Sequence, residues 1–284
     1  MIPARFEYAR ATSLDDALAK LKTANGGGKF IAGGHSLVPL MKLRLSEPQL
    51  LIDISRIPDL AGIHERDGKI TIGAGTVHHD VATSSLLQKR CPVVSEAAAT
   101  IGDPQVRNRG TLGGSVAHAD PSADMPAVML ALNAEVHLKG PKGWRVVKAP
   151  DFFKDLFTVD MAADEILVSV QFAPVRTAAY AKLYQRASHF AIVGVAASLE
   201  ASGGTIVSAR IGLTGAASHA RRLINVEQAL AGQPLSKDAI ERGAQVAGLD
   251  LQDVNSDLHA SADYRRAMIP VFTRRALTAA MARA

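Results

Sequence analysis

Apolar positions recur at helical spacing through residues 14–21, directly after the segment Ser13-Leu14-Asp15-Asp16. That segment has the form of a helix capping box with aspartate in place of the usual glutamate, so a helix should begin there and end near Asn25. Short apolar runs at 29–32 and 50–54 predict two strands, with a short helix at 37–41 between them. The first sixty residues are therefore expected to form a small α/β unit with parallel strands.

Beyond residue 69 the pattern changes to a second, longer unit. A glycine-rich stretch at 101–124 divides this unit and is expected to be irregular. The expected regular elements are a strand at 70–75, helices at 78–88, 93–100 and 125–132, a hairpin of strands 134–138 and 144–147, and a closing strand at 166–172.

The region after Pro174 differs again, because strands are expected first and helices only afterwards. The strands are predicted at 181–186, 191–199 and 205–213, and three helical segments follow them. This order is typical of an α+β domain. We therefore expect an α+β protein with one domain at 1–175, made of subdomains at about 1–60 and 61–175, and a second domain at 176–284.

Composition narrows the class of protein. The 284 residues are 48% apolar and 21% charged, which is typical of a folded protein of two or three units. The net charge is +5, but Lys and Arg are scattered, which argues against nucleic-acid binding. The single cysteine, Cys91, excludes an internal disulfide and an iron–sulfur cluster held by this chain alone.

Signals for secretion or membrane insertion are recognised by long apolar segments. The N-terminus has no apolar signal region, and no stretch approaches the roughly 18 apolar residues of a membrane helix. We expect no transmembrane segment and a cytoplasmic location, which leaves room for association with the inner face of the membrane.

Two glycine turns carry the clearest chemical signal. Glycines before a helix N-terminus let a phosphate approach the backbone, although a single such turn more often only reverses the chain. Two of them suggest a pyrophosphate, as in a dinucleotide. Neither turn contains the Gly-Lys-Ser/Thr of a nucleotide-triphosphate loop or the GxGxxG of a nicotinamide site. The turns consist of Ala32, Gly33, Gly34, His35 and Ser36, and of Thr111, Leu112, Gly113, Gly114 and Ser115.

Three segments in this order, AGGHSLVPLMKLRL, GDPQVRNRGTLGGSVAHADPSAD and DEILVSV, resemble the FAD-binding medium subunits of the molybdenum hydroxylase family. That family includes aerobic carbon monoxide dehydrogenase and xanthine dehydrogenase, and the resemblance extends to the AD-YRR segment at 262–266. It implies a two-subdomain, PCMH-type FAD-binding domain followed by a domain of three-stranded antiparallel sheet plus helices. It also implies that the two turns hold the FAD pyrophosphate through backbone amides and hydroxyls.

The same resemblance assigns roles to five further residues. It implies that Asp124 hydrogen-bonds the FAD chain, and that Ile101 and Leu167 line the flavin or the adenine. A strand from Gln185 to Phe190 would approach the isoalloxazine. Relatives often have a basic residue at the position of Gln185 and a tyrosine at that of Phe190, so the flavin environment here departs from the family pattern.

Further implications concern function and partners. The resemblance implies noncovalent FAD, a large subunit with the molybdenum cofactor and a small subunit with iron–sulfur clusters, assembled as a dimer of heterotrimers. This chain would take electrons from the small subunit and pass them to an external acceptor. Two alternatives remain open at this point: a self-contained flavoenzyme that oxidises its own substrate, and a non-catalytic nucleotide-binding module.

The remaining candidate residues do not favour another chemistry. The segments 78–80 and 118–120 contain His and Asp, but without the spacing of a zinc site, so we predict no metal. The residue types of Arg107 and Arg109 agree equally well with binding a phosphate, contacting a partner surface or anchoring their own loop. His35 suits a helix cap as well as a base, and no GxSxG nucleophile motif is present. We therefore predict no catalytic residue in this chain.

Overall fold

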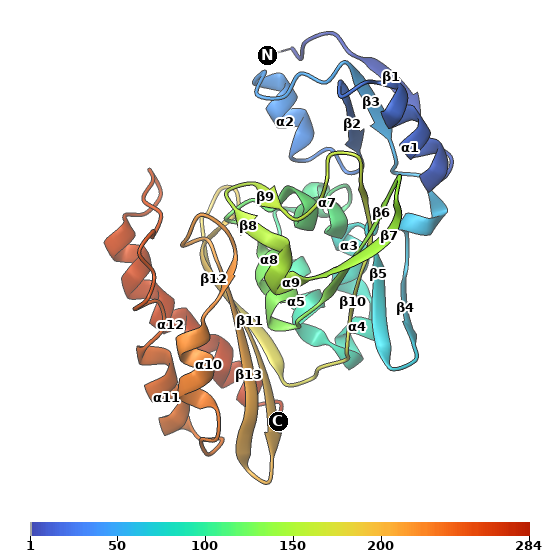
Figure 1. The fold of residues 1–284 in the computed structure, drawn as a ribbon. Coiled ribbons are helices and arrows are strands. Elements are labelled where there is room, and N and C mark those ends of the chain that lie inside the picture. Colours follow the sequence, from blue (N-terminus) through green and yellow to red (C-terminus); the bar gives the residue numbers. More distant parts are fainter. Residues whose placement is uncertain (1) are drawn as a thin grey trace.

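The N-terminal unit of the computed structural model, which describes residues 2–284, is a small parallel sheet with two helices (Figure 1). The strands pair in the order β1 (Glu7–Arg10), β3 (Leu50–Asp53) and β2 (Gly28–Ile31), with α1 (Leu14–Thr23) and α2 (Leu37–Lys42) in the connections. Ser13 caps α1, because its hydroxyl accepts a hydrogen bond from the amide of Asp16. The expected parallel pair of strands is confirmed. Strand β1 was not expected, since its side chains are mostly exposed and carry no apolar pattern.

The second unit is built on a five-stranded antiparallel sheet. The strand order is β4 (Ile63–Arg66), β5 (Lys69–Gly73), β10 (Ile166–Phe172), β6 (Glu135–Gly140) and β7 (Gly143–Lys148). The closing strand β10 thus lies between two hairpins and is buried along most of its length, as its apolar sequence predicts. The elements beside this sheet are η1 (Pro58–Leu60), α9 (Ala149–Phe152) and the ribbon of β8 (Phe153–Asp155) and β9 (Thr158–Val159).

One predicted helix of the second unit is divided in the structure. The single helix expected at 78–88 is two helices, α3 (His78–Thr83) and α4 (Ser85–Arg90). They are separated at Ser84, whose backbone is extended and whose hydroxyl accepts from the amide of Leu87 to cap α4. The other two predicted helices are α5 (Pro92–Ala99) and α8 (Asp124–Ala131), close to the predicted positions.

The stretch 101–124 is not wholly irregular, which corrects the prediction. It contains α6 (Pro104–Arg107), capped by Asp103, and α7 (Leu112–His118), capped by Thr111. Each helix is too short for apolar periodicity to show in the sequence, so local capping fixes it instead. One consequence is that the second glycine turn lies inside the first turn of α7.

The C-terminal unit has an antiparallel sheet of β11 (Ala178–Tyr184), β12 (Ala191–Ser202) and β13 (Thr205–Thr214), with the two-residue β14 (Arg221–Arg222) at its edge. Three helices follow, α10 (Ile224–Leu230), α11 (Lys237–Gln245) and α12 (Ala262–Met281), and they lie on one side of the sheet (Figure 1). The expected three-stranded sheet with helices is confirmed. Strand β11 begins and ends a few residues before the predicted positions.

The second and C-terminal units are in direct contact through α8, which packs on β12 and β13. At Gly212 the approach is close enough that a Cβ atom would lie 2.1 Å from the carbonyl oxygen of Ala127. Glycine is required there because any side chain would push the helix off the sheet. No helix within residues 2–284 has the length and apolar character needed to cross a membrane.

Candidate functional site

The two glycine turns lie against each other although they are far apart in the sequence. A Cβ atom on Gly33 would lie 2.2 Å from the carbonyl oxygen of Arg109 and 2.9 Å from the Cα atom of Gly110. The backbone before the second turn therefore passes directly against the backbone of the first. The tertiary structure thus brings the two predicted phosphate-binding segments into one place.

The first turn presents a row of free backbone donors. Within residues 2–284, the N–H groups of Gly33, Gly34, His35 and Ser36 form no hydrogen bond. Gly34 has φ +75°, a conformation that favours glycine. Consecutive free N–H groups in such a turn form an anion-binding concavity. The imidazole of His35 is exposed and contacts the carbonyl oxygen of Gly33 at 3.1 Å, so it does not cap α2.

The second turn differs, which corrects the expectation that both turns offer free amides. The amides of Leu112, Gly113 and Gly114 donate to the Thr76 carbonyl, the Ala74 carbonyl and the Thr111 hydroxyl, respectively. The amide of Ser115 donates to the carbonyl of Thr111. The donors that this turn can offer to a ligand are therefore mainly the hydroxyls of Thr111 and Ser115.

The two glycines of the second turn have different surroundings. A Cβ atom on Gly113 would lie 2.3 Å from the Cβ of Ala74 and 2.6 Å from its Cα, so Gly113 is required by packing inside the protein. Gly114 is exposed, and a Cβ atom there would approach only the side chain of Thr111. Of the two, Gly114 is the one whose open side can face a ligand.

Basic residues lie around the contact between the turns. The guanidinium of Arg107 donates to the carbonyls of Ile101 and Gly102, so it anchors its loop, whereas Arg109 is exposed. His78 is buried, its amide donates to the carbonyl of Gly110, and its Nδ1 has no partner within the described chain. Burial, reinforced by the charges of His35 and Arg107, lowers the pKa of His78 to about 4.

Asp124 is the first residue of α8, and its carboxylate is enclosed by two residues that sequence reasoning missed. The Tyr180 hydroxyl donates to its Oδ1, and the Lys182 ammonium donates to its Oδ2 at 2.9 Å. The Lys182 side chain is only 4% exposed and also contacts the carbonyl of Thr100. Burial raises the pKa of the Asp124 carboxyl, and Lys182 opposes that rise. The signal in the sequence was two long polar residues at alternate positions of an alanine-rich strand, on one face.

Leu167 belongs to the apolar core of the second unit, and Ile101 packs against that core. Leu167 on β10 is buried at 5% exposure, whereas Ile101 is partly exposed and lies directly after Thr100, the carbonyl contact of Lys182. Of these two predicted lining residues, Ile101 has the more accessible side chain.

Residues 185–190 form a tight turn between β11 and β12, not the predicted strand. The reason is local: the side-chain oxygen of Gln185 accepts from the backbone amides of Ala187 and Ser188, and the backbone amide of Gln185 donates to the carbonyl of Phe190. Phe190 is 48% exposed at the end of this turn. His189 fixes the turn to the other domain by a 2.8 Å contact with the carbonyl of Gly102.

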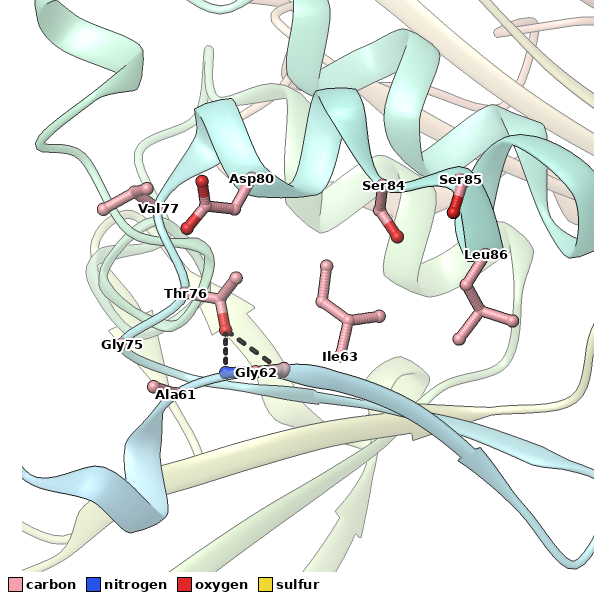
Figure 2. Close-up of a pocket in the computed structure, with 10 residues that line it drawn as sticks. All are labelled: Ala61, Gly62, Ile63, Gly75, Thr76, Val77, Asp80, Ser84, Ser85 and Leu86. Carbon is pink, nitrogen blue, oxygen red and sulfur yellow. Dashed lines mark hydrogen bonds between the residues drawn. The ribbon is translucent and has the colours of Figure 1, made fainter.

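Two cavities lie near these residues. A cavity of about 210 Å³ borders the turn and is lined by Gln185, Phe190, Asp120 and Arg265, among others. A larger one of about 430 Å³ lies between the β4–β5 hairpin and helices α3 and α4 (Figure 2). There the Thr76 hydroxyl bonds to both the amide and the carbonyl of Gly62. None of the predicted cofactor-binding residues lines the larger cavity. No group of metal-ligating side chains occurs within residues 2–284.

The residues present fit an FAD. Four free N–H groups and two hydroxyls suit the oxygens of a pyrophosphate, and the glycines allow it to approach the backbone. The carboxylate of Asp124 suits a hydroxyl of a sugar or ribityl chain, and the apolar Ile101 and Phe190 suit an aromatic ring. The fold and the site therefore define the class of an FAD-binding flavoprotein.

Comparisons with known proteins agree with this class. Residues 4–174 match the family described as the FAD binding domain in molybdopterin dehydrogenase, and residues 178–280 match the CO dehydrogenase flavoprotein C-terminal domain. The chain is 41% identical to the carbon monoxide dehydrogenase medium chain of Hydrogenophaga pseudoflava, over 100% of this chain and 99% of the relative. It is 36% identical to the glyceraldehyde dehydrogenase medium chain of Sulfolobus acidocaldarius, over 97% and 98% of the two chains.

Solved structures show the same similarity. The carbon monoxide dehydrogenase structure from Hydrogenophaga pseudoflava that lacks the Mo-pyranopterin moiety superposes with a TM-score of 0.95 at 42% identity, covering 100% and 99% of the two chains. Quinoline 2-oxidoreductase from Pseudomonas putida 86 gives 0.92 at 32% identity, covering 99% of each chain. The chain belongs to the family of FAD-binding flavoprotein subunits of molybdenum-containing dehydrogenases, the group that includes the carbon monoxide dehydrogenase medium chains.

Proposed function

We propose that this chain binds one noncovalent FAD across its two glycine turns. The observation that carries this proposal is the row of free N–H groups from Gly33 to Ser36 beside the hydroxyls of Thr111 and Ser115. The pyrophosphate oxygens accept from these donors, and the exposed Gly114 leaves the necessary space.

The other predicted residues differ in how directly they act on the cofactor. Ile101 and Phe190 contact its rings, because both have accessible apolar surface. Asp124, whose carboxylate is paired with Lys182, hydrogen-bonds the FAD chain. Leu167 acts from the core beneath the site, and Gln185 acts by shaping the turn that presents Phe190.

We further propose a division at about residue 175, which agrees with the two family matches that end at 174 and begin at 178. Residues 1–175 would hold the FAD, with subdomains at about 1–60 and 61–175 that meet at the glycine turns. Residues 176–284 would complete the site through β11 and the turn that follows it.

In the complex, this chain is the electron-transfer subunit. It takes electrons from an iron–sulfur small subunit and passes them to an external acceptor, while a large subunit with the molybdenum cofactor oxidises the substrate, in a dimer of heterotrimers. The lone buried Cys91 supports this division of labour, because cysteine-ligated clusters need several thiolates. Relatives named for carbon monoxide, glyceraldehyde and quinoline share this fold, which supports selection of the substrate by another subunit.

The bound flavin supplies hydride or single-electron transfer, and the chain supplies binding and orientation. No side chain of this subunit is assigned a proton-transfer step with the substrate. The first test is the flavin content of the purified protein. We expect one FAD per chain, released by acid precipitation, and a nicotinamide cofactor, FMN or flavin retained on the denatured chain would contradict the proposal.

The second test separates an electron-transfer subunit from a self-contained flavoenzyme. The flavoprotein alone should not bleach its FAD anaerobically with carbon monoxide, an aldehyde or an N-heterocycle. The complete complex should bleach it on addition of its substrate. Fast bleaching by the isolated chain, free of molybdenum and iron, would favour the self-contained enzyme.

A further inference from the structure

Tyr180 on β11 reaches from the C-terminal domain to the carboxylate at the start of α8. Its hydroxyl donates to Oδ1 of Asp124, and Lys182, two residues further on the same strand, donates to Oδ2. The carboxylate is therefore held between two donors that both come from the other domain. Because Asp124 is buried, the direction of its remaining lone pairs is fixed by these two contacts.

The neighbouring strand leaves space for this hydroxyl. Gly194 on β12 pairs with Lys182, and a Cβ atom on Gly194 would lie 2.3 Å from the Tyr180 hydroxyl oxygen and 2.8 Å from Cγ2 of Thr214. Glycine in the middle of a strand weakens it, so its presence here needs a reason. The φ angle of Gly194 is not positive, so the reason is space and not backbone conformation.

We propose that Tyr180 is a positioning residue of the FAD site, whose hydroxyl holds Asp124 in the orientation that the FAD chain requires, and that Gly194 is glycine to admit this hydroxyl. The inference rests on the proposed role of Asp124 in FAD binding. It adds to the proposed contribution of the C-terminal domain a residue that itself contacts no cofactor.

The network also predicts a pH dependence. Burial raises the pKa of the Asp124 carboxyl, while the ammonium of Lys182 and the hydroxyl of Tyr180 favour its ionised form and lower it. Besides the backbone amide of Asp124 itself, these two are the charged or polar groups that face the carboxylate within residues 2–284. Loss of the Tyr180 hydroxyl removes one stabilising donor, so the pKa of Asp124 rises further. FAD binding that needs the carboxylate then weakens at a higher pH than in the unmodified protein.

The experiment measures FAD affinity of the apoprotein by flavin fluorescence for Tyr180→Phe, Gly194→Ala and the double variant. Each single variant should raise the Kd about tenfold, since a hydrogen bond to a charged group is lost. In the double variant the 2.3 Å contact is removed, because phenylalanine has no hydroxyl, while the contacts of the added Cβ with Cγ2 of Thr214 (2.8 Å) and with Cζ of the ring (3.1 Å) remain. Its Kd should therefore lie clearly below the product of the two single effects, because the two substitutions share the contact with the hydroxyl. Tyr184→Phe, an exposed tyrosine on the same strand, is the matched control and should bind FAD normally.

The pH profile separates positioning from simple loss of structure. Tyr180→Phe should unfold at nearly the same temperature as the unmodified apoprotein, and its acid-side loss of FAD affinity should begin at a higher pH. If Gly194→Ala does not fold, the FAD affinity and the pH profile of Tyr180→Phe still test the positioning role of Tyr180.

Asp124→Asn distinguishes failure of this inference from failure of the proposed function. If Asp124→Asn weakens FAD binding but Tyr180→Phe has unchanged affinity and an unchanged pH profile, the positioning role is wrong and the FAD site stands. If Asp124→Asn binds FAD normally, Asp124 has no part in the site, and both statements about it are wrong.

Discussion

Gly33 and the carbonyl oxygen of Arg109 are in such close backbone contact that a Cβ atom on Gly33 would lie 2.2 Å from that oxygen. This contact joins the N-terminal parallel unit to the stretch that leads into α7. The glycines of the first turn therefore serve the packing of the protein as well as the approach of a ligand. A pyrophosphate site that needs both turns can form only where this contact holds them together.

The first prediction is that Gly33→Ala weakens the contact between the turns. The added methyl group would displace the backbone at Arg109, at a cost of about 2 kcal/mol in the free energy of unfolding. FAD affinity should fall with it, measured by flavin fluorescence, and stability should be measured by urea unfolding. Gly27→Ala is the control, because the closest neighbour of its Cβ is the flexible end of Gln49. Equal stability of the two variants would contradict the structural role of Gly33.

The second prediction separates the two glycines of the second turn. Gly113→Ala should destabilise the protein strongly, because its Cβ would lie 2.6 Å from the Cα of Ala74. Gly114→Asp should leave the fold intact and abolish FAD binding, because an exposed carboxylate would repel the pyrophosphate. Circular dichroism and flavin content distinguish the two outcomes. A folded Gly114→Asp protein with full flavin would show that this turn does not face the phosphates.

The third prediction concerns His78 and acid stability. Its pKa is lowered from 6.5 to about 4 in the folded protein, so the unfolded chain binds more protons between these values. Stability that is present above pH 6.5 is therefore lost as the pH falls toward 4, by on the order of 3 kcal/mol. Urea unfolding of the apoprotein at pH 7.5 and pH 5 should show about 2 kcal/mol of this loss, because at pH 5 it is not yet complete, and His78→Gln should reduce it. The same pH dependence in both proteins would rule out His78 as its source.

The fourth prediction compares two arginines of α12. Arg265 is buried and donates to the carbonyls of Ile192 and Gly215 and to Asp257. Arg265→Met should cost about 2 to 4 kcal/mol in the free energy of unfolding, since it leaves these acceptors without a partner. Arg274 forms an exposed ion pair with Glu241, so Arg274→Ala should cost at most about 1 kcal/mol. Thermal and urea unfolding test the difference, and similar losses would contradict it.

Much of this protein could be predicted from its sequence, because the relevant signals are local. The capping serine before α1, the apolar runs of β3 and β10, and the change of pattern after Pro174 predict the main elements and the α+β class. The two glycine turns and the long motif around the second indicated the family, and the comparisons confirm it. The very short helices α6 and α7 were not predicted, because they are too short to show the apolar periodicity of a helix.

The assembly of the site was decided only by the tertiary structure. The sequence indicates that Gly33 and Gly113 belong to phosphate-type turns, but not that Arg109 and Ala74 press against them. It also gives no sign that the amides of Leu112 and Gly113 are already occupied, because their acceptors, the carbonyls of Thr76 and Ala74, lie in a distant loop after β5. Tyr180 reaches Asp124 across 56 positions of sequence. Such contacts depend on how whole elements pack, whereas caps and periodicity depend only on residues a few positions apart.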